Sequence, residues 1–309
     1  MRPRSGLVIL LVAGACALLL VRGPASAGHT ADPDYPNGSS LSPQAIDPAI
    51  FSPGACMAYA PANRSRHETV FLDAGHGGVD PGGVGGDGSA TVDESTVNLP
   101  VELDTMQILR AQGYRVVVSR TGNTSVTRLR RADVTAGALT LRGVAADVAA
   151  RDKCANRARA DILIGIYMDA GSPGAAGCLT GYDAARPFSA ENFRLATLLQ
   201  GDVLGAMNSR GWDVPDQGVL SDTGLGSTLT SSAAAYGHLM LLGPAKAGYF
   251  STPSKMPGAL IEPLYLTDPP EASMAASAQG QQVIALAIAQ AVDQYFAPAN
   301  PGSAAHETG

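Results

Sequence analysis

A histidine set among glycines is the feature of this chain best suited to chemistry. His76 follows the apolar run 70–72 and lies in the glycine-rich segment 75–83. A short apolar run bounded by Gly and Pro predicts a buried strand that ends in a turn. The imidazole would then lie at the carboxyl end of a strand, where open α/β sheets bind their ligands. Glycine lets the backbone approach whatever the ring holds, so we expect the functional site at this turn.

Two glutamates are further candidates. Glu94 begins a predicted helix, where the helix dipole favours an acidic side chain in any case, and its sequence distance from His76 makes it a site candidate. Glu262 falls within the apolar stretch 259–266. A buried carboxylate without a partner is costly, and burial raises its pKa unless a cation is near. We therefore expect Glu262 to have a partner or a catalytic role.

The elements that must position these side chains alternate between strands and helices. Expected strands cover residues 69–73, 114–119, 161–168, 177–182, 239–242 and 259–266, and expected helices cover 94–112, 144–159, 190–210 and 275–296. Alternation of this kind predicts an α/β fold: a single domain with a twisted, mostly parallel sheet of about six strands flanked by helices. The stretches 121–143 and 213–236 carry no clear pattern and are interpreted as long loops.

The N-terminus has the pattern of an export signal. Arg2 and Arg4 precede the apolar stretch 6–21, and small residues at 25–27 supply a cleavage site. We interpret residues 1–27 as a signal peptide, which predicts a secreted protein of the cell envelope, extracellular or periplasmic. An uncleaved membrane anchor is the alternative, although the apolar stretch is short for a span of about 20 residues.

Composition divides the remainder of the chain into three parts. Residues 28–66 are rich in Pro, Ser and Asn and predict an extension or linker. Residues 67–297 form the predicted catalytic domain, and residues 298–309 are expected to be a disordered tail. The formal net charge of −6 does not favour binding to nucleic acid, or to an anionic membrane after removal of the signal.

Three cysteines remain after signal removal: Cys56, Cys154 and Cys178. Export permits disulfides, and an odd number leaves at least one thiol unpaired or paired to another chain. Sequence does not choose the pair. Pairing of Cys56 with one of the other two is favoured, because it would pin the N-terminal extension to the domain.

The segment 70–83 resembles the opening motif of zinc-dependent N-acetylmuramoyl-L-alanine amidase catalytic domains. Further matching segments follow in the family's order: Glu94 with Asn98-Leu99, residues 114–120, Arg151 with Ala155-Asn156, residues 160–166 and residues 257–262. The resemblance covers nearly the whole predicted domain. It implies the amidase α/β fold, zinc as cofactor, and peptidoglycan or muropeptides as partners.

The resemblance also implies roles for individual residues. In the family, zinc is held by the histidine of the opening motif, a glutamate at the start of the first helix and a histidine on a central strand. The first two ligands carry over to His76 and Glu94, and the family's general base carries over to Glu262. Tyr167 stands where the third ligand, a histidine, is expected. A phenol with a pKa of about 10 must ionise before it can bind the metal.

Several residues remain open as the third donor: Tyr167 as a phenolate, Asp80, Asp169 or His238. His238 precedes the expected strand 239–242 and would lie at its amino end, which is the wrong edge of the sheet. Tyr167 is equally well interpreted as a core aromatic residue whose hydroxyl has a hydrogen-bond partner.

Two functions therefore remain open. One is an exported peptidoglycan hydrolase that cleaves the amide bond between N-acetylmuramic acid and L-alanine by zinc-activated water, with Glu262 as the base. The other is a catalytically impaired, amidase-like protein that binds peptidoglycan or regulates another wall hydrolase. His76, Glu94 and Glu262 together favour the first function, and Tyr167 favours the second.

Overall fold

The computed structural model describes residues 42–225, 231–249 and 251–298. The predicted signal peptide, the first part of the predicted extension and residues 299–309 of the predicted tail lie outside the described residues. The described residues belong to one α/β domain. Among them, no helix combines the length and the apolar character that crossing a bilayer requires.

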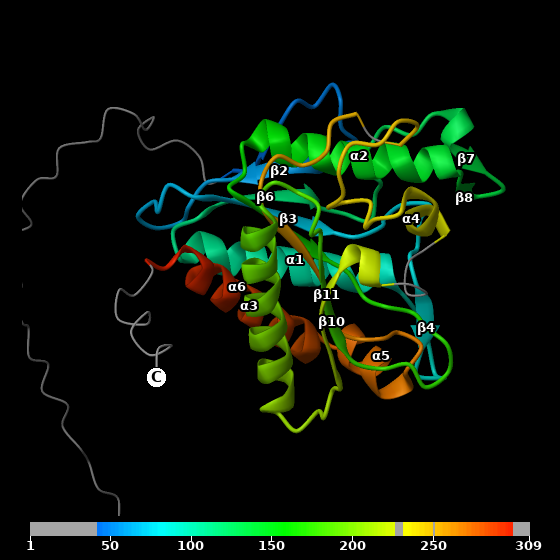
Figure 1. Ribbon diagram of the computed structural model, residues 1–309, viewed down its shortest axis with the longest axis vertical. Coiled ribbons are helices and arrows are strands. Elements are labelled where there is room, and N and C mark those ends of the chain that lie inside the picture. Colours follow the sequence, from blue (N-terminus) through cyan, green and yellow to red (C-terminus); the bar gives the residue numbers. More distant parts are fainter. Residues whose placement is uncertain (1–41, 226–230, 250, 299–309) are drawn as a thin grey trace, which may run out of the picture. The chain divides into compact units, whose positions relative to one another are not determined.

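An eight-stranded sheet forms the centre of the domain, in the order β1-β2-β6-β3-β9-β12-β10-β11 (Figure 1). The strands are β1 (Gln44–Ala45), β2 (Ala55–Tyr59), β3 (Thr69–Ala74), β6 (Arg115–Arg120), β9 (Ile162–Ile166), β10 (Cys178–Tyr182), β11 (Asp216–Ser221) and β12 (Gly258–Glu262). The central strands β6, β3, β9 and β12 are parallel. β10 is antiparallel to β12, and β11 is parallel to β10. The predicted fold class is confirmed, with two more strands than expected.

Helices cover both faces of the sheet (Figure 1). They are α1 (Glu94–Ala111), α2 (Leu141–Ala158), α3 (Ser189–Asn208), α4 (Ser231–Tyr236), α5 (Pro269–Ala276) and α6 (Ala278–Phe296). Successive side chains of β3 point to opposite faces. Val70 and Leu72 pack into the core shared with α1, α3 and α6, whereas Phe71 packs into the core shared with α2. The predicted helix 275–296 corresponds to α6, but its first two residues belong to the end of the separate helix α5, because Ser277 caps the start of α6 with its side chain.

The prediction of a loose extension is wrong for residues 42–66. β2 pairs with β6 and is the second strand from the edge of the sheet, Phe51 is fully buried, and Cys56 forms a disulfide with Cys154 of α2. The polar composition of this segment concealed its few apolar anchors. The expected pairing of Cys56 with one of the other cysteines is confirmed, and Cys178 is a buried free thiol.

The prediction of a strand at 239–242 is also wrong. These residues form a turn whose leucines pack on the sheet face, where glycines make room for them. A Cβ atom at Gly181 would lie 2.6 Å from Leu239, and one at Gly165 would lie 3.0 Å from Leu241. A short apolar run can form either a strand or a turn whose side chains pack on the sheet, and hydrophobic periodicity does not distinguish the two.

Both predicted loops contain regular secondary structure. The stretch 213–236 contains β11, the 3-10 turn η2 (Asp222–Gly224) and α4. The stretch 121–143 contains the 3-10 turn η1 (Arg131–Asp133) and the short hairpin of β7 (Val134–Thr135) and β8 (Ala138–Leu139). A second hairpin, β4 (Val84–Gly86) with β5 (Thr91–Asp93), connects the histidine turn to α1.

Candidate active site

The carboxyl ends of three parallel strands bring the predicted site residues together. His76 follows β3, Tyr167 follows β9, and Glu262 is the last residue of β12. Strand register aligns these ends, because Ile166 is opposite both Ala74 and Ile261. A cleft of about 460 Å³ opens there, and its lining includes all four predicted site residues: His76, Glu94, Tyr167 and Glu262.

The His76 ring lies between two carboxylates. Nδ1 is 2.9 Å from Oδ2 of Asp80, and Nε2 is 3.1 Å from Oε2 of Glu94. Burial lowers the pKa of His76, but the two carboxylates outweigh this effect and raise the pKa to about 10. His76 has a φ of 61°, a left-handed conformation that is uncommon for a residue with a Cβ atom. The turn thus holds the imidazole in a fixed and costly position.

Glu94 is positioned as the first residue of α1, and each of its oxygens is held. Oε2 accepts a hydrogen bond from the Gly83 amide at 2.7 Å, while Oε1 accepts from the Met168 amide at 3.0 Å and from Asn98 Nδ2 at 3.1 Å. The neighbouring turn passes very close, since a Cβ atom at Gly82 would lie 2.5 Å from Oε2 of Glu94. Glycine at this position allows the His76–Glu94 pair to form.

Two buried arginines hold the backbone of the histidine turn. Arg151 of α2 donates to the carbonyl oxygens of His76 at 2.7 Å and Ala74 at 2.8 Å. Arg120, at the end of β6, donates to the carbonyl oxygens of Ala74 and Gly75, both at 3.1 Å. The sequence comparison noted both arginines as motif positions but missed this role. An arginine at the end of the largely apolar strand β6 was the available signal, because buried charges require partners.

Glu262 shares a hydrogen bond with Asp169 at the edge of the cleft. Burial raises the pKa of Glu262 well above its usual range, and the nearby Asp169 and Glu94 carboxylates add to this effect. Burial also raises the pKa of Asp169. Neighbouring carboxyl groups in such a site hold a shared proton. The Glu262 carboxyl group can therefore accept a proton from a molecule in the cleft or donate a proton to it. Sequence reasoning considered Asp169 only as a metal donor.

Tyr167 uses its hydroxyl to contact Asp73 rather than the His76–Glu94 pair. The hydroxyl donates to Oδ2 of Asp73 at 3.0 Å, and Oδ1 of Asp73 accepts from Arg151 at 2.7 Å. Burial raises the pKa of Tyr167 well above its usual range, and the negative charge of Asp73 raises it further. The ring packs edge-on against the His76 ring at a centroid distance of 5.4 Å. Tyr167 is thus a neutral, hydrogen-bonded wall of the cleft.

Comparison with known proteins identifies the family. Residues 70–294 match the family model described as N-acetylmuramoyl-L-alanine amidase. The chain belongs to this amidase family. The match confirms the family resemblance and the expectation of an amidase.

Characterised relatives share about a quarter of their residues with this amidase-family chain. It is 27% identical to the N-acetylmuramoyl-L-alanine amidase AmiA of Escherichia coli (strain K12) over 250 residues, which cover 74% of this chain and 75% of AmiA. It is 26% identical over 228 residues to the germination-specific N-acetylmuramoyl-L-alanine amidase of Bacillus subtilis (strain 168), covering 74% and 79% of the two chains.

A solved structure supports the same fold. The N-acetylmuramoyl-L-alanine amidase of Clostridium difficile 630 aligns with a TM-score of 0.52 and 26% identity, covering 75% of this chain and 97% of that one. The CwlD amidase of Clostridioides difficile, solved in complex with the GerS lipoprotein, aligns with a TM-score of 0.56 and 20% identity, covering 74% and 98%. The latter likeness concerns the fold alone.

The donor atoms of the amidase-family site fit a zinc ion at two positions. His76 Nε2 and Glu94 Oε2 are 3.1 Å apart, close to the separation of about 3.4 Å between two ligands of one tetrahedral zinc ion. Asp80 binds the other ring nitrogen, as a carboxylate commonly does for a metal-ligating histidine. The third position does not fit, because the hydroxyl of Tyr167 is bound to Asp73 and its raised pKa opposes the phenolate.

The other residues considered as a third donor lie elsewhere. Asp80 contacts Nδ1 of His76 rather than the cleft-facing Nε2, and Asp169 is bonded to Glu262. His238 is bonded to Asp222. In the part of the chain that the structure describes, no third His, Cys, Asp or Glu donor lies within 4.8 Å of both His76 and Glu94. The expected three-ligand set is therefore incomplete.

Proposed function

We propose that this protein is a peptidoglycan hydrolase of the cell envelope that cleaves the amide bond between N-acetylmuramic acid and L-alanine. One observation carries the proposal: His76, Glu94 and Glu262, which are distant in sequence, line a single cleft at the carboxyl ends of the sheet. Membership of the amidase family supports the choice of bond. The predicted signal peptide supports export.

Glu262 performs the proton transfers in this proposal. A raised pKa suits a carboxyl group to general acid–base catalysis near neutral pH. In its ionised form Glu262 takes a proton from the attacking water, and the same proton then passes to the nitrogen of the leaving L-alanine. Asp169, bonded to Glu262, positions the carboxyl group and adjusts its proton affinity.

His76 and Glu94 are the proposed metal-binding residues. A zinc ion held there would polarise the amide carbonyl and lower the pKa of a bound water. The two arginines keep the His76 backbone in place, and Asp80 fixes the orientation of the ring. Because Tyr167 supplies no third donor, we expect zinc to be retained weakly, and activity to depend on added zinc.

The test is digestion of purified sacculi with zinc supplied, followed by mass spectrometry of the products. The proposal requires peptides with a free L-alanine amino group, released together with glycan that keeps its lactyl ends. Glu262→Gln should lower the rate by at least about 100-fold. Glu191→Gln, an exposed glutamate on α3, is the matched control and should leave the rate unchanged.

The second candidate function rests on the hydrogen bond between Tyr167 and Asp73. It describes a protein that keeps the cleft but binds peptidoglycan without cleaving it. Cosedimentation with sacculi, measured on the same preparations, distinguishes the two functions. Binding without any released peptide at saturating zinc would reject the hydrolase and support the binding protein.

A further inference from the structure

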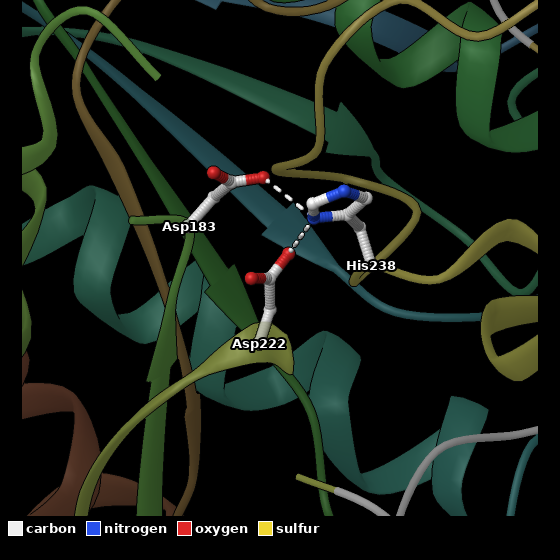
Figure 2. A group of neighbouring side chains, drawn as sticks. All are labelled: Asp183, Asp222 and His238. Atoms are coloured by element: carbon white, nitrogen blue, oxygen red, sulfur yellow. Dashed lines mark hydrogen bonds and ion pairs between the residues drawn. The ribbon is translucent and has the colours of Figure 1, made fainter. Parts of the chain in front are cut away.

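A second histidine–carboxylate cluster lies away from the proposed catalytic pair. Asp183 directly follows β10, Asp222 directly follows β11, and His238 follows α4. Since β10 and β11 are parallel neighbours, their carboxyl ends meet, and Figure 2 shows both carboxylates pointing at the same nitrogen of His238. Both aspartates are fully buried. β10 runs antiparallel to β12, so the cluster lies at the opposite edge of the sheet from Glu262.

One carboxylate oxygen of this cluster lacks a hydrogen-bond donor. Nδ1 of His238 is 2.9 Å from Oδ2 of Asp222 and 3.2 Å from Oδ2 of Asp183. One ring nitrogen carries at most one proton, so it can satisfy only one of the two oxygens. Oδ2 of Asp183 accepts no hydrogen bond although it is buried and faces the cluster. A buried carboxylate oxygen without a donor is costly.

The charge of the cluster is also unbalanced. Two buried carboxylates face one imidazole, so the group carries net negative charge when both carboxylates are ionised, even if the ring is protonated. Arg186, a cation close to Asp183 in the sequence, donates instead to the carbonyl oxygens of Leu242 and Gly243, both at 3.0 Å. A bound cation would neutralise this excess of negative charge.

The spacing of the donors matches a single metal ion. Two ligands bonded at about 2.1 Å are separated by about 3.0 Å in an octahedral site and about 3.4 Å in a tetrahedral one. The observed N···O distances are 2.9 and 3.2 Å, and all three donor atoms lie within 4.8 Å of one another. We propose that Asp183, Asp222 and His238 bind a divalent first-row transition-metal ion. An imidazole donor favours zinc or a similar ion over calcium and magnesium.

Such an ion would have a structural role. It would join the ends of β10 and β11 to the segment that follows α4. That region supplies Leu225, Leu239, Met240 and Leu241 to the lining of the proposed catalytic cleft. The ion would therefore hold one wall of the cleft in place without contacting the reacting groups.

The test is titration of Zn²⁺ alone into metal-free protein by calorimetry, with thermal unfolding as a second readout. His76→Ala removes the proposed catalytic pair, so zinc bound by this variant reports on the second site. We expect one equivalent of zinc and a rise in Tm on zinc addition. Adding Asp222→Asn, which preserves side-chain size, should weaken zinc binding by at least about 10-fold and abolish the rise in Tm.

Two further variants complete the test. His238→Ala, made in the same His76→Ala background, should abolish the binding in the same way. His67→Ala in that background is the matched control, since His67 is exposed, and it should bind zinc unchanged. If His238→Ala does not fold, zinc binding by the Asp222→Asn variant alone tests the proposal. The proposal is overturned if the His76→Ala protein binds no zinc, or if Asp222→Asn binds zinc as tightly as its parent.

Discussion

At the scale of the residue, Tyr167 decides how the proposed catalytic centre differs from the expected zinc site. Its hydroxyl continues a buried chain of contacts through Asp73 to Arg151. Arg151 in turn holds the carbonyl oxygen of His76. Tyr167 thus stabilises the turn that carries His76, the first expected zinc ligand, but does not itself supply the third ligand. Ring packing keeps this arrangement tight, because a Cβ atom at Gly75 would lie 2.3 Å from the Tyr167 ring.

Replacement of Tyr167 by histidine tests this interpretation. Tyr167→His should raise zinc affinity by at least about 10-fold, since a neutral imidazole binds zinc at pH 7 without the cost of ionising a phenol. Zinc binding is measured by calorimetry in an Asp222→Asn background, so that the second proposed site does not contribute. Tyr167→Phe, which keeps the ring and removes the hydroxyl, is the control and should bind zinc no more tightly than its parent. Equal affinities for the histidine and tyrosine proteins would contradict the interpretation.

At the scale of the element, α1 joins the site to the sheet. Its first residue is Glu94, and two turns later Glu102 accepts hydrogen bonds from the Ala74 amide at 3.0 Å and the Ser119 amide at 2.9 Å. These bonds join α1 to β3 and β6, next to the histidine turn. Glu102 is fully buried. Burial raises the pKa of Glu102 to about 7, and the nearby Asp73 contributes to the increase.

The raised pKa of Glu102 predicts a pH-dependent stability. Between pH 4.5, the usual pKa of glutamate, and about pH 7, the folded protein binds this proton more tightly than the unfolded chain. The contribution of Glu102 to the free energy of unfolding therefore falls as pH rises through this window. Glu102→Gln imitates the protonated form and should remove the pH dependence that Glu102 gives to the free energy of unfolding. At pH 8 the variant should be more stable than the wild type by up to about 3 kcal/mol.

Urea unfolding at pH 4.5 and pH 8 measures the effect. We expect nearly equal stabilities for wild type and Glu102→Gln at pH 4.5, and a clear advantage for the variant at pH 8. Glu191→Gln, at an exposed position, should follow the wild type at both values. A difference between wild type and Glu102→Gln that is the same at both pH values would exclude Glu102 as the titrating group.

At the scale of the whole molecule, one covalent bond joins the sheet to the helix on its face. The disulfide between Cys56 and Cys154 links residues 98 positions apart. Closing a loop of about 100 residues restricts the unfolded chain and contributes about 3 to 5 kcal/mol in the chain-entropy description. The bond also links α2, which carries Arg151, to β2, the second strand from the edge of the sheet.

Reduction of this disulfide should destabilise the protein. Thermal or urea unfolding with and without reductant should show a loss of about 3 to 5 kcal/mol for the wild type. Cys178→Ala should remain sensitive to reductant, because Cys178 is a free thiol. The double variant Cys56→Ala/Cys154→Ala should be less stable and insensitive to reductant. Insensitivity of the wild type would show that the disulfide contributes nothing to stability.

Local patterns in the sequence determined much of this fold and site. The apolar run before His76 predicted β3, and the glycines after it predicted the turn. The alternation of strands and helices predicted the α/β class, because hydrophobic periodicity is a local property of the chain. His76, Glu94 and Glu262 could be named as site residues because each stands at the end of a recognisable element or within a matching motif.

Only the tertiary structure decided the partners of these residues. The hydrogen bond from Tyr167 to Asp73, the pairing of β2 with β6 and the meeting of Asp183, Asp222 and His238 all join parts of the chain that are far apart in sequence. Periodicity and propensity describe neighbours along the chain, whereas hydrogen bonds and metal coordination depend on distances across it. The direction of a single tyrosine hydroxyl, and the ends of two neighbouring strands, are set by packing.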